Sequence, residues 1–173
     1  TWDIKSKGPV GNLNTETLTN IFNENISIPD FFKEAYSSSS SLSEAVRKYM
    51  NYLFGEYGLI TIDPNSKNLK KNISHIMVDD IVNNTIEKIE KSSDKVSDVY
   101  VRKINFFYQE SDLRERIDKT DKYNVLSTNL SFTEQEIKER IKSSPELFSP
   151  NVITRCLFQQ KILPNVCYLG GPS

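Results

Sequence analysis

The sequence has little of what metal sites and disulfide frameworks are built from. It contains one histidine and two cysteines in 173 residues, and it lacks the C-x-x-C and H-E-x-x-H patterns of common metal sites. We therefore expect no metal site. Two thiols are too few for a disulfide framework. Because Cys156 and Cys167 stand in apolar runs, we expect both to be unreactive core residues rather than nucleophiles.

An excess of one charge and a long hydrophobic run are also missing. The 22 basic and 23 acidic side chains leave a net charge of −1, whereas a nucleic-acid binder usually has a basic surplus. No apolar run approaches the roughly 20 residues of a membrane-spanning helix, and residues 1–11 have no signal-peptide pattern. We therefore expect a globular cytoplasmic domain with neither a nucleic-acid nor a membrane partner.

Both ends of the sequence interrupt patterns that look ordered. The chain starts at Thr1 without an initiator methionine, and it stops directly after Gly170, Gly171 and Pro172. We expect it to be a piece of a longer protein, or the ordered part of one.

The first half alternates helical and strand patterns. Ser41 and Glu44 form a capping-box pattern at the start of a helix over residues 42–54. The β-branched run "GLITIDP" (58–64) predicts a buried strand, and a long helix is expected over residues 66–91. This succession favours an α/β fold.

The second half predicts a small β region followed by a return to helix. Residues 99–109 and 124–132 are expected to form two partner strands, and Thr133 caps the next helix. We therefore divide the chain into three predicted parts. Residues 1–98 are helical with part of a core sheet (strand near 58–64), residues 99–132 are a β insertion, and residues 133–173 return to the core.

Polar residues in the first two parts are weak site candidates. Asp63 ends the predicted strand, where ligands of open α/β sheets bind, but Asp-Pro is also a common turn. The Asp79–Asp80 pair is expected on a solvated helix face, and His75 in a structural or surface role. Arg102 and Asn105 interrupt an apolar strand pattern, so we interpret them as buried polar groups that fix strand register or link domains.

The last stretch of the chain holds the strongest candidates. Asn151, Arg155 and Gln159 recur every four positions, which places them on one helical face where Arg155 can bind a carboxylate. Gly170 and Gly171 follow a strand-like run, and the backbone amides of such a turn can approach an anion. Together these five residues predict a substrate cleft.

Four blocks of the sequence resemble the bacillithiol-biosynthesis cysteine-adding enzyme (BshC) family. They are "GPVG" (8–11), "YGLITIDP" (57–64), "VRKINFFY…LRERI" (101–117) and "FSPNVITRCLFQQKILPNVCYLGG" (148–171). They follow the order of the family over nearly the whole chain. Cys156 departs from the family, which usually has proline after the arginine.

The resemblance implies a Rossmann-like core, a connecting insertion and a coiled coil in a cytoplasmic enzyme. Family members are thought to join cysteine to glucosaminyl-malate, with ATP or ADP as the nucleotide. The nucleotide-binding segments of the family and its coiled coil have no counterpart in this sequence. We therefore expect a central fragment that has no cofactor of its own and is inactive alone. The resemblance leaves open whether the intact protein is a homodimer.

Two alternatives remain open. One is another nucleotide-dependent ligase or transferase that shares the core. The other is a non-catalytic interaction module that binds a partner through the helices over residues 42–54 and 66–91. The expected reaction of the ligase is amide formation, in which the enzyme positions an activated cysteine carboxyl group for attack by an amine.

Overall fold

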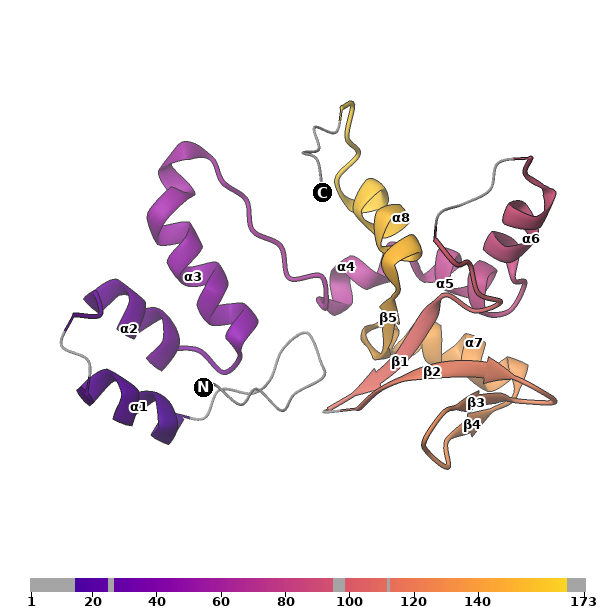
Figure 1. Ribbon diagram of the computed structural model, residues 1–173, viewed down its shortest axis with the longest axis horizontal. Coiled ribbons are helices and arrows are strands. Elements are labelled where there is room, and N and C mark those ends of the chain that lie inside the picture. Colours follow the sequence, from indigo (N-terminus) through magenta and orange to yellow (C-terminus); the bar gives the residue numbers. More distant parts are fainter. Residues whose placement is uncertain (1–14, 25–26, 95–98, 112, 168–173) are drawn as a thin grey trace. The chain divides into compact units, whose positions relative to one another are not determined.

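The chain forms two compact units, residues 1–64 and residues 65–173, and each is described here by itself (Figure 1). Among the residues described, no helix combines the length and the apolar character needed to cross a membrane. The computed structural model describes residues 15–24, 27–94, 99–111 and 113–167.

Unit 1 contains the helices α1 (Thr15–Glu24), α2 (Asp30–Ser37) and α3 (Leu42–Phe54) and the single turn η1 (Gly55–Tyr57). The predicted cap of α3 is confirmed, because the Ser41 hydroxyl accepts a hydrogen bond from the Glu44 amide at 3.3 Å. The Glu44 carboxylate, however, accepts from the amide and the hydroxyl of Ser40, at 3.0 Å each. The capping interaction therefore extends one residue further back than the sequence pattern predicts.

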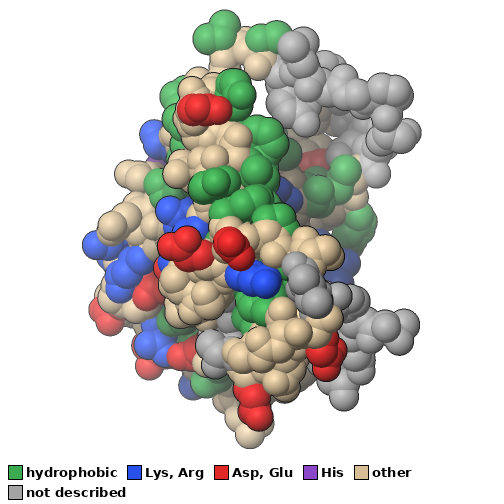
Figure 2. Space-filling view, turned by 90° about the vertical axis from the view of Figure 1, so that its left-hand side faces the viewer, with side chains coloured by type: hydrophobic (Ala, Val, Ile, Leu, Met, Phe, Trp, Pro, Cys, Tyr) green, Lys and Arg blue, Asp and Glu red, His purple; other side chains and the backbone are tan. Residues whose placement is uncertain are grey.

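Stacked aromatic rings join α2 to α3. The rings of Phe31 and Tyr52 lie parallel with centroids 4.4 Å apart, and Phe32 contacts Tyr49 at 5.2 Å. Several large hydrophobic side chains of this unit are nevertheless exposed, and Figure 2 shows hydrophobic side chains gathered at the surface of the face that it views. The exposed ones that follow one another along the chain are Tyr52, Leu53, Phe54, Tyr57, Leu59 and Ile60.

The prediction of a strand over residues 58–64 is wrong. None of these residues pairs with a strand among those described, and Ile60 is 79% exposed. A strand is stable only where its N–H and C=O groups bond to a neighbouring strand. The β-branched pattern predicts the conformation but does not supply that neighbour. Asp63, which is half-buried, therefore does not stand at a strand end.

Unit 2 begins with three short helices, where the sequence predicts one long helix over residues 66–91. They are α4 (Lys67–Lys71), α5 (Ser74–Ile81) and α6 (Thr85–Ser92). Asn84 separates the last two with a left-handed backbone (φ 53°), which asparagine tolerates better than most residues. Its side chain donates to the carbonyl groups of Asp80 at 3.3 Å and Lys103 at 2.9 Å. These bonds stabilise the turn that ends the helix.

The centre of unit 2 is an antiparallel sheet of five strands in the order β4-β3-β2-β1-β5 (Figure 1). Two of the predicted strands are shorter than expected, and the prediction that they pair with each other is wrong, because a strand over residues 113–119 lies between them. The first begins only at Phe106, and the second is divided by a turn with Ser127 at φ 60°. The strands are β1 (Phe106–Glu110), β2 (Leu113–Lys119), β3 (Tyr123–Val125), β4 (Ser131–Phe132) and β5 (Phe148–Pro150).

The remaining helices of unit 2 are α7 (Glu134–Ser143), the turn η2 (Pro145–Leu147) and α8 (Val152–Ile162). Thr133 caps α7 in a complete capping box with Glu136, as predicted. The helices and the sheet confirm the predicted α/β class. All strand pairs of this sheet are antiparallel, so the described strands do not include the parallel pairing of a doubly wound sheet. The predicted boundaries near residues 98 and 132 stay predictions.

The two faces of the sheet differ because side chains alternate along each strand. Phe106 and Tyr108 are buried, whereas Phe107 is half-buried on the opposite face. Phe107 pairs with Arg116 on β2 and with Ser149 on β5, so these three side chains share that second face. The core on the first face contains Ile73, Met77, Ile81, Val82, Ile104, Phe106, Tyr108, Ile117, Tyr123, Val125, Ile137, Ile141, Phe148 and Phe158.

We expect Phe148→Ala to destabilise the protein by about 3–5 kcal/mol, the usual cost of a cavity left by a buried phenylalanine. Phe148 is fully buried and contacts the Tyr108 ring edge-on at 5.8 Å. Urea unfolding measures the change. The control Ile89→Ala, at a side chain that is 62% exposed, is expected to change stability by less than about 0.5 kcal/mol. Equal losses in the two variants would contradict this description of the core.

Candidate functional site

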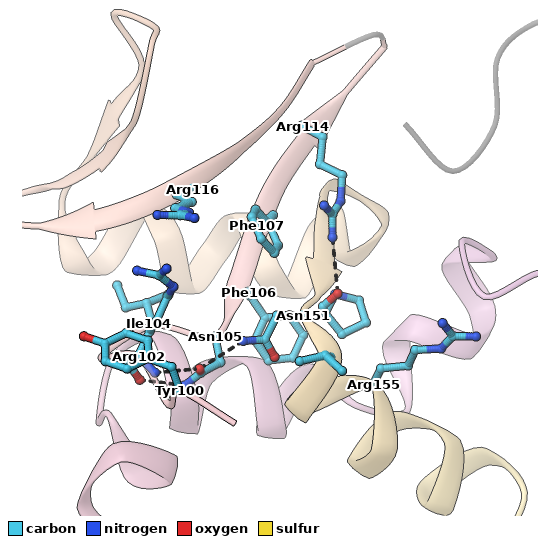
Figure 3. Close-up of a pocket in the computed structure, with 12 residues that line it drawn as sticks. Tyr100, Arg102, Ile104, Asn105, Phe106, Phe107, Arg114, Arg116, Asn151 and Arg155 are labelled. Carbon is cyan, nitrogen blue, oxygen red and sulfur yellow. Dashed lines mark hydrogen bonds between the residues drawn. The ribbon is translucent and has the colours of Figure 1, made fainter. Parts of the chain in front are cut away.

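A pocket of about 470 Å³ lies where the second face of the sheet meets the start of α8 (Figure 3). Strands β1 and β2 supply aromatic and basic side chains, and the residues before β1 and after β5 complete the wall. We call it the arginine pocket. It is lined by Tyr100, Arg102, Ile104, Asn105, Phe106, Phe107, Arg114, Arg116, Pro150, Asn151, Val152 and Arg155.

The lining of the arginine pocket carries charge of one sign. Among the residues that the structure describes, it includes four arginines and no aspartate or glutamate. Within the described residues, none of the four forms an ion pair with a carboxylate, and the five described ion pairs all involve lysine. Four uncompensated guanidinium groups around one hollow attract an anion, and each can bind a carboxylate or a phosphate through two hydrogen bonds.

Arg114 is the most firmly held of the four. Its guanidinium lies over the Phe107 ring at 3.9 Å from the centroid, donates from Nε to the Ser149 hydroxyl at 3.3 Å, and donates from an NH2 group to the Pro150 carbonyl at 3.4 Å. Burial lowers the pKa of Arg114 from its ordinary value, although an arginine still stays charged. Such a preoriented guanidinium loses little freedom when it binds a ligand.

The other three arginines reach the pocket from different segments. Arg102, before β1, lies over the Tyr100 ring at 5.0 Å, and Arg116 is exposed on β2. In Figure 3 these two side chains are drawn on one side of the pocket, and Arg155 points away from them. Exposed arginine side chains can adjust to an incoming anion, whereas Arg114 is already oriented.

Beneath the pocket is a buried carboxylate. Asp80 on α5 is fully buried and accepts hydrogen bonds from the backbone N–H of Asn105 at 2.5 Å and from its side-chain amide at 2.9 Å. Burial raises the pKa of Asp80 to about 6, against the opposing effect of the two bonds from Asn105. Burial thus disfavours the charged form of the carboxyl group, and the Asn105 donors offset that cost in part.

Asn151 joins this buried network to helix α8. Its side-chain oxygen caps the helix by accepting from the amides of Ile153 at 2.9 Å and Thr154 at 3.0 Å. Its side-chain amide donates to the Asn105 side-chain oxygen at 3.0 Å. Thr154, also buried, donates to the Asn105 carbonyl at 2.9 Å. The start of α8 is thus attached to the segment that precedes β1.

The predicted site residues are brought together only in part. Asn151 and Arg155 both line the pocket, but Asn151 caps α8 rather than lying within it. Gln159 is exposed on α8 and does not line the pocket, nor does Asp63. Gly170 and Gly171 lie outside the described residues. A role in substrate binding stays a prediction for all six residues, and the geometry favours Arg155, whose side chain has no hydrogen-bonded partner among the residues described.

Three predictions about single residues are corrected. Asp80 is buried, unlike Asp79 beside it, because the helix turns by about 100° per residue and only one of them faces the sheet. Arg102 is exposed, whereas the predicted burial of Asn105 is confirmed. Cys156 and Cys167 are exposed rather than in the core. Cys156 lies on α8, which buries only Thr154 and Phe158, and Cys167 lies beyond the end of that helix.

Sequence reasoning did not identify Arg114, Arg116 or Phe107 as site residues. The alternation in "LRERI" (113–117) was the available signal, because it places both arginines on the face opposite Ile117. Across the described part of the chain, no group of three or more His, Cys, Asp and Glu side chains is placed to hold a metal ion, and His75 is exposed.

Fold and pocket together define an α/β domain with a cationic, arginine-lined pocket. The chain belongs to the bacillithiol biosynthesis BshC family: the family model of the N-terminal Rossmann-like domain matches residues 5–173. The resemblance of the four sequence blocks to this family is therefore confirmed.

Bacterial relatives match the whole chain. Proteins named "Putative cysteine ligase BshC" are 38% identical in Cytophaga hutchinsonii, 39% in Flavobacterium psychrophilum and 37% in Flavobacterium johnsoniae, over 98–100% of this chain. In each case the chain covers 35% of the relative. The chain thus spans about a third of the length of the curated relatives it matches.

The buried Asp80 makes stability depend on pH. Its pKa is about 6 in the folded protein and 3.8 ordinarily, so between these values the folded state binds more protons than the unfolded state. The Asp80 contribution is fully present below pH 3.8 and is lost as the pH rises through about 6. At about 1.4 kcal/mol per pKa unit, the loss is about 3 kcal/mol.

Urea unfolding from pH 3.5 to 7.5 tests this dependence. In Asp80→Asn the loss of about 3 kcal/mol is expected to disappear from the profile. The matched control is Asp79→Asn, at the exposed neighbour, and it should retain the wild-type profile. Parallel profiles for the wild type and Asp80→Asn would contradict a raised pKa at this carboxyl group.

Proposed function

We propose that this chain is part of a cysteine ligase of bacillithiol biosynthesis, and that its arginine pocket binds the anionic end of a substrate. The observation that carries the proposal is the set of four arginines around one pocket whose described lining contains no carboxylate. Membership of the BshC family supplies the reaction class, since the relatives are named as cysteine ligases.

The substrate that we propose for the pocket is glucosaminyl-malate. Its malate part carries two carboxylates, and arginine pairs with a carboxylate through two parallel hydrogen bonds. A volume of about 470 Å³ is enough for a small polar molecule of this kind. Because Arg114 is already oriented by Phe107, Ser149 and Pro150, we assign it to the first carboxylate and the exposed arginines to the second.

The proposed reaction is amide formation between the carboxyl group of cysteine and the amine of the glucosamine. The carboxyl group must be activated before attack, with ATP or ADP as the proposed nucleotide of the intact protein. The phosphoryl or nucleotidyl group placed on the carboxyl group then leaves as the amide bond forms. We assign no residue of this chain to the nucleotide. The contribution of the chain is to bind and orient the acceptor, so that its amine lies within reach of the activated carboxyl group.

We also propose that the intact protein contains a coiled coil, forms a homodimer and is located in the cytoplasm, and that the chain by itself is inactive.

The competing function, an interaction module, has one observation in its favour, the exposed Tyr52, Tyr57 and Ile60 of unit 1. It does not account for a pocket lined by four arginines, so we place the ligase first.

Removal of a single arginine should weaken binding of the anionic substrate selectively. In the intact protein that contains this chain, Arg116→Ala and Arg155→Ala are each expected to raise the KM for glucosaminyl-malate about tenfold, because a charge-assisted hydrogen bond contributes about 1.5–3 kcal/mol. The KM for cysteine should stay unchanged. Steady-state kinetics with each substrate varied in turn provides both constants.

The matched control is Arg47→Ala, which removes an exposed arginine from α3 in unit 1. It should leave both KM values at the wild-type level. A wild-type KM for glucosaminyl-malate in both pocket variants would refute the assignment of the pocket. An enzyme that accepts a different amine would favour the alternative ligase or transferase.

A further inference from the structure

Asn105 uses all of its side-chain hydrogen-bonding capacity within the protein. Its amide donates to Asp80 Oδ1 at 2.9 Å and to the Arg102 carbonyl at 2.7 Å. Its carbonyl oxygen accepts from the Arg102 N–H at 3.1 Å and from the Asn151 side-chain amide at 3.0 Å. Both amide hydrogens and both oxygen lone pairs are therefore engaged. Although Asn105 lines the pocket, it has no polar atom left for a ligand.

These bonds meet on segments that carry pocket arginines. Arg102 is held at both its N–H and its C=O, so the point from which its side chain extends is determined (Figure 3). Asn151 caps α8, and Arg155 follows one turn later. The main chain of Asn105 adds two more bonds to the same helix start, accepting from Asn151 N at 3.0 Å and from Thr154 Oγ1 at 2.9 Å.

The centre of the network is shielded from water. Asn105 is 1% exposed, and Asp80 and Thr154 are fully buried. Truncation of the Asn105 side chain would remove four hydrogen bonds, and at the buried Asp80 Oδ1 water cannot readily replace the lost donor. The two main-chain bonds of Asn105 would still attach the start of α8, whereas the side-chain bonds that fix its distance from Arg102 would be lost.

We propose that Asn105, held in place by Asp80, is the positioning residue of the arginine pocket. It sets the separation between Arg102 and the start of α8, and thereby the spacing of the cationic groups that meet the substrate anion. This inference rests on the proposed anion-binding role of the pocket. Asn105 acts through Arg102 and Asn151 and not by contact with the ligand.

The first test compares anion affinity with stability. In the intact protein, calorimetry with L-malate is expected to give about tenfold weaker binding for Asn105→Ala than for the wild type. Ile141→Ala, a fully buried side chain on α7 outside the pocket lining, is the stability-matched control. It is expected to lose stability in urea while its affinity stays within about twofold of the wild type.

The second test is a double-mutant cycle, because a merely structural role of Asn105 would produce no coupling between Asn105 and Arg102 in ligand affinity. If Asn105 acts by placing Arg102, the loss caused by Asn105→Ala should shrink to about threefold or less in an Arg102→Ala background. Asn151→Ser guards against misfolding of the alanine variant. Serine preserves the helix cap but removes the donor to Asn105, so weaker binding by a folded protein is expected.

The outcomes separate this inference from the proposed function. Wild-type affinity in Asn105→Ala and in Asn151→Ser would overturn the positioning role and leave the pocket assignment standing. The same conclusion would follow if the losses of affinity in Asn105→Ala and Arg102→Ala were strictly additive. Absence of L-malate binding by the wild type would overturn the pocket assignment and this inference together. Weaker binding with non-additivity supports both.

Discussion

The buried carboxylate of Asp80 is the constraint on which the arrangement of unit 2 depends. A carboxylate without access to water needs hydrogen-bond donors, and Asn105 supplies two of them. Asn105 stands directly before β1, which begins at Phe106. The same asparagine accepts a hydrogen bond from the side chain of Asn151, the residue that caps α8. One buried carboxyl group thus links a helix, a strand and a second helix far apart in sequence.

The charge distribution of unit 2 explains how a nearly neutral chain presents a cationic site. The net charge of −1 averages over a surface on which lysines pair with glutamates, as Lys67 does with Glu146. Such exposed pairs contribute little stability, but they neutralise the surface around them. The pocket arginines form no such pair within the described part of the chain, and Arg114 is instead stacked on an aromatic ring. Local pairing, rather than total charge, creates the site.

The sequence predicted correctly those features that depend on interactions between residues close together in the chain. The caps at Ser41 and Thr133 involve residues three apart and were predicted correctly, as was the α/β class. The strand over residues 58–64 failed because pairing needs a neighbour that its own sequence cannot specify. The prediction that Cys156 is buried failed, because the apolar run gave no information about which side of α8 is covered. Of the residues that line the arginine pocket, the sequence pattern singled out Asn151 and Arg155, whose role in substrate binding stays a prediction, but not Arg114, Arg116 or Phe107.

The sequence by itself determined the family, the class of fold, the caps of the helices and the alternation that separates the two faces of each strand. These follow from side-chain chemistry at short spacing along the chain. Only the tertiary structure decided that Asp80 is buried, that Asn105 binds three segments, and that arginines from β2, α8 and the residues before β1 surround one pocket. Those facts depend on contacts between residues some 25 to 50 positions apart, and such contacts leave no periodic signal in the sequence.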